Sequence, residues 1–134
     1  MSEGTSGSSV RVLVVEDSVD SAETLALLLG RWGYDVRMAH DGASALKAAR
    51  QFHPQIILLD IGLPDMDGYA VADRLRGEDL AGEMLVALTG YGEAQDRARA
   101  RQAGFDRHLT KPVDPDALQK LLGGAESSPT SGAA

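Results

Sequence analysis

Apolar and polar positions alternate along the chain in a way that predicts strands and helices in turn. Five short segments are apolar or rich in β-branched residues and are predicted as strands: residues 10–15, 35–39, 56–60, 84–89 and 107–109. Between and after them, apolar residues recur every three or four positions, as on one face of a helix. Such alternation implies right-handed crossovers and a parallel sheet with helices on both faces. We therefore predict an α/β fold, a doubly wound five-stranded (βα)5 sheet.

The predicted helices have recognisable ends. A fourth, Ala- and Arg-rich helix carries Ala94, Ala98 and Arg101, and the last begins with Pro115. The predicted N-caps are Ser18 or Asp20, Asp41, Asp67 and Asp114. The predicted ends are Gly33, His53-Pro54, Gly77, Gly104 and Gly123.

Composition places one folded domain between two polar tails. Residues 1–9 and 123–134 consist mostly of Gly, Ser, Thr, Ala and Pro, so we expect both to be disordered and the domain to span residues 10–122. The net charge of −7 argues against a nucleic-acid partner. The chain has no cysteine, which excludes disulfides and thiolate chemistry and fits a reducing compartment. Without an apolar run near the ~20 residues of a membrane span or a signal sequence, we expect a cytoplasmic protein with no membrane partner.

Polar residues follow four of the five predicted strands. Glu16 and Asp17 come after the first strand, Asp60 ends the third, Thr89 ends the fourth, and Lys111 follows the fifth. The carboxyl ends of parallel strands lie along one edge of the sheet, where open α/β folds bind ligands. The sequence therefore predicts that these side chains face one crevice.

In this order, Glu16-Asp17, Asp60, Thr89 and Lys111-Pro112 resemble the receiver domain of two-component response regulators. The resemblance covers residues 10–122 and implies a flavodoxin-like fold with strand order 2-1-3-4-5. The segments 62–64 and 105–109 are similar to receivers attached to hybrid histidine kinases.

The resemblance assigns a role to each acidic residue. It implies that Asp60 is the phosphoacceptor, whose carboxylate attacks a phosphohistidine and becomes an acyl phosphate. It also implies that Glu16, Asp17, Asp60 and the backbone carbonyl of Gly62 hold a divalent cation. Ligands that are all oxygen suit Mg²⁺. The ion would offset the repulsion among the carboxylates and the incoming phosphoryl group.

The remaining residues are implied to act on the phosphoryl group and on the switch. Lys111 resembles the lysine that pairs with the phosphoryl group, and Pro112 the proline of a cis Lys-Pro bond. Thr89 resembles the switch hydroxyl, and Tyr91 would overhang the site. At the position of the usual switch aromatic, Tyr or Phe, this chain has His108. An imidazole is smaller and titrates near neutrality, so we expect some pH sensitivity.

The resemblance thus implies a phosphoacceptor signalling domain in a phosphorelay. Its partner would be a sensor histidine kinase or a histidine phosphotransfer protein, and it would catalyse only its own phosphorylation and dephosphorylation. Phosphorylation would change the face formed by the fourth helix, the fifth strand and the last helix. We expect a monomer or weak dimer.

Two other functions stay open on the residues alone. Asp60 could be the nucleophile of a Mg²⁺-dependent phosphohydrolase, or the chain could be a receiver-like binding module that is never phosphorylated. The stretch from Asp65 to Gly68 is similar to the DxD motif of haloacid dehalogenase-like phosphatases. That motif needs its first Asp at a strand end, whereas Asp65 follows Pro64 in a loop, and we interpret Asp67 as a helix cap.

Overall fold

The computed structural model describes residues 10–90 and 103–126. These residues contain one sheet of five parallel strands in the order β2-β1-β3-β4-β5. The predicted fold class and strand order are confirmed. The strands are β1 (Arg11–Val15), β2 (Asp35–Ala39), β3 (Ile56–Asp60), β4 (Met84–Thr89) and β5 (Arg107–Thr110).

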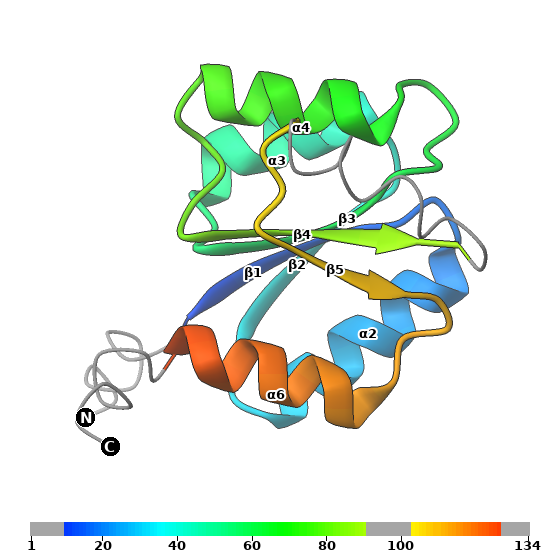
Figure 1. Cartoon of the computed structure of the whole chain (residues 1–134), viewed down its shortest axis with the longest axis vertical. Helices are drawn as coiled ribbons and strands as arrows, with labels where there is room; N and C mark the ends of the chain where they lie inside the picture. Colours follow the sequence, from blue (N-terminus) through cyan, green and yellow to red (C-terminus); the bar gives the residue numbers. More distant parts are fainter. Residues whose placement is uncertain (1–9, 91–102, 127–134) are drawn as a thin grey trace.

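The described helices form a layer on each face of the sheet (Figure 1). Helices α2 (Val19–Arg31) and α6 (Pro115–Glu126) cover one face, and α3 (Gly42–Phe52) and α4 (Gly68–Gly77) cover the other. Each layer buries its own core: Leu29 and Leu118 pack in one, and Leu46 and Leu75 in the other. None of the described helices has the length and apolar character that crossing a membrane would require.

The central strands contribute to both cores. Every residue of β3 and β4 is buried. Successive side chains of a strand point to opposite faces, so Ile57 and Leu59 enter the core beneath α3 and α4, while Ile56 and Leu58 enter the other. A wholly apolar run before Asp60 is therefore what a strand covered on both faces requires.

Side chains at the predicted N-cap positions accept hydrogen bonds from N–H groups of the first helical turns. Asp41 accepts from the Ser44 N–H at 2.8 Å, and Ser18, not Asp20, is the first cap. Asp67 and Asp114 accept from Tyr69 and Ala117.

Several details differ from the sequence predictions or lie beyond them. Strand β1 begins at Arg11, one residue later than predicted. Helix α6 continues through Gly123 to Glu126, so the prediction that Gly123 ends it is wrong. A glycine ends a helix by adopting a left-handed conformation, as Gly33 does at φ 96°, and Gly123 has no positive φ. Strand β5 is one residue longer than predicted and reaches Thr110. The predicted helix around Ala94 and Ala98 lies outside the described residues.

Candidate metal site at the carboxyl edge of the sheet

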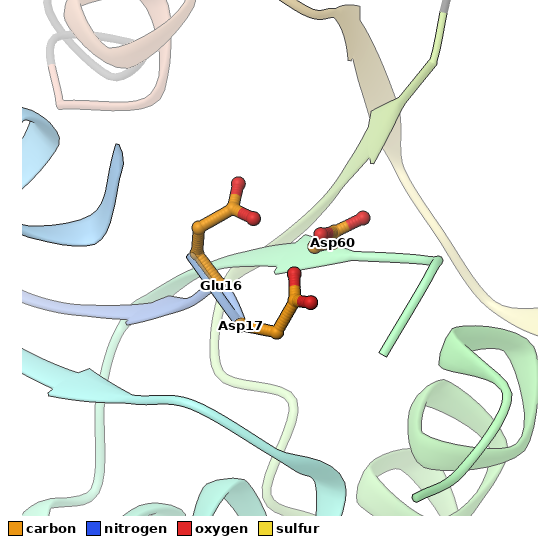
Figure 2. A group of neighbouring side chains, drawn as sticks. All are labelled: Glu16, Asp17 and Asp60. Atoms are coloured by element: carbon orange, nitrogen blue, oxygen red, sulfur yellow. The ribbon is translucent and has the colours of Figure 1, made fainter. Parts of the chain in front are cut away.

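Three carboxylates meet where the central strands β1 and β3 end. The two strands are neighbours, with Val15 paired to Leu59, so Glu16 and Asp17 emerge beside Asp60. One carboxylate oxygen from each of the three side chains lies within 4.8 Å of the other two. Figure 2 shows the carboxylates gathered around a common space. The parallel register thus produces the convergence that the sequence predicts.

The cluster is buried on one side and open on the other. Glu16 is 1% exposed and Asp60 is 3% exposed, whereas Asp17 is exposed. A pocket of about 190 Å³ reaches Asp60 from the surface, and its lining is Asp17, Asp60, Ile61, Gly62, Gly90 and Lys111. A small ligand can therefore approach Asp60 through this pocket, whose lining does not include Glu16.

Lys111 is the cation beside these acids. Its Nζ lies 3.0 Å from Asp60 Oδ2 and 3.6 Å from Glu16 Oε1. The N–H of Lys111 donates to the Thr89 carbonyl at 2.7 Å, which ties the end of β5 to β4. The bond between Lys111 and Pro112 is cis, as the resemblance implied. The lysine thus reaches the site from the far side of β4.

Both oxygens of Asp60 have hydrogen-bond donors. Oδ2 accepts from Lys111, and Oδ1 accepts from the Gly62 N–H at 2.9 Å. Two donors on different elements fix the rotation of the carboxylate. Its orientation therefore depends on the loop that carries Gly62 as well as on β5.

The pKa values of the two buried acids, Glu16 and Asp60, shift in opposite directions. Burial, reinforced by the hydrogen bond and the charge of Asp60, raises the pKa of Glu16 to about 7. Burial alone would also raise the pKa of Asp60. Hydrogen bonds from Glu16, Gly62 and Lys111 outweigh it and hold that pKa below its ordinary value. Burial disfavours the Lys111 ammonium, yet Asp60 and Glu16 raise its pKa overall.

The residues present fit a divalent cation. Three carboxylates face one ammonium, which leaves an excess of two negative charges when all are ionised. Burial is the largest cause of the raised pKa of Glu16, and the hydrogen bond and charge of Asp60 add to it. The donors are all oxygens, as hard cations prefer. Glu16, Asp17 and Asp60 could therefore hold a metal ion.

Thr89 and His108 occupy the neighbouring strands. Asp60 pairs with Leu88, so Thr89 lies one residue beyond the level of Asp60. Thr89 is 7% exposed, and its hydroxyl donates to the Leu109 carbonyl of β5 at 3.4 Å. His108 is half-buried and pairs with Ala87. Tyr91 lies outside the described residues.

Sequence reasoning assigned no role to Asp65. Its carboxylate accepts from the N–H groups of Gly42 and Ala43, at 2.7 and 3.1 Å, at the start of α3. The partners are 22 and 23 residues away along the chain. No local sequence pattern predicts a contact over this distance. The signal in the sequence was an acidic residue in the same loop as Gly62.

A family model of the response regulator receiver domain matches residues 12–123. The chain belongs to the response regulator receiver domain family. The family that the sequence predicts is therefore confirmed. Receivers are signalling domains of two-component systems and not enzymes in the ordinary sense.

Relatives and solved structures agree with this assignment. The receiver is 34% identical over 109 residues to the DNA-binding dual master transcriptional regulator RpaA of Synechocystis, covering 81% of this chain and 45% of RpaA. It is 34% identical over 111 residues to the sensor histidine kinase RcsC of Escherichia coli, covering 83% of this chain and 12% of RcsC. The chain thus spans less than half the length of either relative.

One similar structure is a co-crystal of the Saccharomyces cerevisiae phosphotransfer protein Ypd1 with the receiver domain of its response regulator Ssk1. A chain of it aligns with a TM-score of 0.81 and 26% identity, over 88% of this receiver and 89% of that chain. Receivers therefore pair with histidine kinases or phosphotransfer proteins.

Proposed function

We propose that Asp60 accepts a phosphoryl group from a phosphohistidine. The observation that carries this is the state of Asp60: its lowered pKa keeps it ionised, two donors orient it, and a pocket exposes it. A carboxylate oxygen forms a bond to phosphorus as the phosphorus–nitrogen bond breaks. The electron pair of that bond stays on the imidazole nitrogen, and Asp60 becomes an acyl phosphate. The domain would catalyse only this transfer to itself and the later hydrolysis of its own acyl phosphate, in which water takes the phosphoryl group and the Asp60 carboxylate is restored.

Mg²⁺ is the proposed cofactor. Glu16, Asp17, Asp60 and the backbone carbonyl of Gly62 would hold it, on the strength of the clustered oxygens and their excess charge. When bound, the ion supplies positive charge that offsets the carboxylates and the phosphoryl oxygens. Glu16 gives up its proton to serve as a ligand, because only the ionised carboxylate binds the cation well.

Lys111 and Thr89 are proposed to act on the phosphoryl group. Lys111 is held beside Asp60 before transfer, so its ammonium lies within reach of oxygens added to that carboxylate. Thr89 has a weak 3.4 Å hydrogen bond to Leu109, which its hydroxyl can exchange for a phosphoryl oxygen. His108 would respond to that movement from the adjacent strand. The rest of the switching face includes residues outside the described ranges.

The proposed donor is a sensor histidine kinase or a histidine phosphotransfer protein. RcsC is a sensor histidine kinase, and Ypd1 is a phosphotransfer protein crystallised with a receiver, which supports both. A cytoplasmic location and a monomer or weak dimer stay predictions from the sequence and the family resemblance.

Acetyl phosphate with Mg²⁺, followed by intact-protein mass spectrometry, tests the proposal. The wild type should gain one labile phosphoryl adduct, and neither Asp60→Ala nor the isosteric Asp60→Asn should gain any. Asp73→Ala, which removes an exposed acid of α4, is the matched control and should keep the adduct. An adduct on the Asp60 variants would remove Asp60 from the mechanism. Continued turnover of phosphate esters would indicate a phosphohydrolase instead, and a wild type without adduct would indicate a binding module.

A further inference from the structure

The loop between β3 and α4, residues 61–67, closes on itself at its base. The Gly68 N–H donates to the Ile61 carbonyl at 3.0 Å. The two backbones are so close that a Cβ on Gly68 would lie 2.3 Å from Ile61 Cα. The loop therefore leaves and returns at one point beside Asp60, and its tip needs support from elsewhere.

That support comes from the N-terminus of α3. Asp65 accepts from Gly42 N–H at 2.7 Å and from Ala43 N–H at 3.1 Å. First-turn N–H groups have no partner within their helix, and the positive end of the helix dipole favours a carboxylate. Beside it, Met66 packs on Gly42 so tightly that a Cβ there would lie 2.8 Å from Met66 Sδ. Two consecutive residues thus dock the tip on α3.

A second carboxylate caps the same helix without belonging to the loop. Asp41 accepts from the Ser44 N–H at 2.8 Å and from the Ser44 hydroxyl at 2.6 Å, within its own turn. Asp65 and Asp41 therefore both accept hydrogen bonds from N–H groups at the start of α3. Of the two, it is Asp65 that joins α3 to the loop that carries Gly62.

We propose that Asp65 is a positioning residue for Asp60, because it fixes the loop whose Gly62 N–H orients the Asp60 carboxylate. The path is short: Asp65 holds the tip, and Gly62, three residues earlier, donates to Asp60 Oδ1 at 2.9 Å. If the tip is released, Gly62 moves with it, and Asp60 loses one of the donors that orient its carboxylate. The expected effect on Mg²⁺ affinity rests on the proposed function. The tether, by which we mean the contact of Asp65 with the N–H groups of Gly42 and Ala43, does not.

Asp65→Ala and the matched control Asp41→Ala separate positioning from capping. Both remove one acid from the start of α3, so both should lower the melting temperature by similar amounts. In metal-free protein, NMR hydrogen exchange at the Gly62 amide should become about fivefold faster in Asp65→Ala, the change in opening that a lost cap produces. The same amide should be unchanged in Asp41→Ala.

Calorimetric titration with Mg²⁺ at about 0.15 M salt, where long-range charge effects are screened, gives the second measurement. The dissociation constant should rise about tenfold in Asp65→Ala, as for a lost outer-shell contact, and stay within about twofold of wild type in Asp41→Ala. Equal Gly62 exchange in the two variants would overturn the tether. Faster exchange with unchanged Mg²⁺ affinity would overturn the positioning role and leave the proposed function intact. A wild type that binds no Mg²⁺ would overturn both the proposed function and the effect of Asp65 on it.

Discussion

Glu16 and Asp60 share one buried acidic cluster, and yet their pKa values move in opposite directions. Burial, with Asp60 as neighbour, raises the pKa of Glu16 to about 7. Asp60 is buried too, but hydrogen bonds from Glu16, Gly62 and Lys111 bring its pKa below the ordinary value. Near neutral pH, the metal-free site therefore holds an ionised Asp60 next to a partly protonated Glu16.

This difference predicts how the stability of the metal-free receiver depends on pH. Between the ordinary value of 4.5 and about 7, folded Glu16 binds more protons than unfolded Glu16. The free energy of unfolding should therefore fall as pH rises through this window, by up to about 3 kcal/mol from this group. The lowered pKa of Asp60 acts in a separate window: its stabilisation is lost as pH falls below 3.8.

Glu16→Gln isolates this contribution. Urea unfolding in EDTA should show the variant gaining stability over the wild type between pH 5 and pH 8, because glutamine carries no charge to bury. Parallel pH profiles for the two proteins would contradict the assignment to Glu16. Saturating Mg²⁺ should reduce or reverse the difference, since the cation stabilises the ionised carboxylate of the wild type only.

Mg²⁺ should raise the melting temperature of the receiver. A ligand that binds only the folded state stabilises it by about 1.4 kcal/mol at ten times its dissociation constant. Asp17→Asn should weaken this rise, because Asp17 is one of the three clustered carboxylates. Scanning calorimetry with Mg²⁺ and with EDTA measures both effects, and Asp73→Asn is the control. Identical melting curves in the two buffers would count against the proposed ligands.

Removing the Lys111 ammonium should affect Mg²⁺ binding and phosphorylation in opposite directions. Lys111 lies 3.0 Å from Asp60 and 3.6 Å from Glu16, so it competes with Mg²⁺ for the same charge. Lys111→Met should tighten Mg²⁺ binding several-fold, because a positive charge a few ångströms from a divalent cation opposes its binding. It should also slow adduct formation with acetyl phosphate, because the phosphoryl oxygens lose a partner. Lys120→Met, at an exposed position of α6, should change neither. Weaker Mg²⁺ binding by Lys111→Met would show that the lysine does not compete.

A methyl group at Gly68 should damage the fold next to Asp60. The added Cβ would lie 2.3 Å from Ile61 Cα and 3.0 Å from the Asp60 carbonyl, and both are backbone atoms that cannot move aside cheaply. Gly68→Ala should therefore lower the free energy of unfolding by about 2 kcal/mol or more. Gly77→Ala is the control in the same helix: nothing lies within 4 Å of its Cβ, and it should stabilise by about 0.5 kcal/mol. Urea unfolding measures both, and equal effects would contradict the close approach of Gly68 and Ile61.

Much of the fold follows from local patterns. Strands β3 and β4 have the predicted bounds, because a run buried on both faces must be apolar. The edge strand β2 also has the predicted bounds, although most of it is exposed. The cap residues Asp41 and Asp67 act as predicted, because a cap contacts N–H groups only two or three residues away. The prediction that α6 ends at Gly123 was wrong, because glycine permits a helix end without requiring one.

By itself, the sequence determined the order of the elements, the polar residues at the strand ends and, through them, the family. These properties are local, or repeat along one chain direction, and parallel strands bring equivalent ends to one edge. Only the tertiary structure decided that Glu16 and Asp60 differ in pKa and that Asp65 joins the loop after Asp60 to α3. Both depend on burial and on contacts between residues distant in the chain, and such contacts are fixed by the packing of the layers and not by any neighbouring residue.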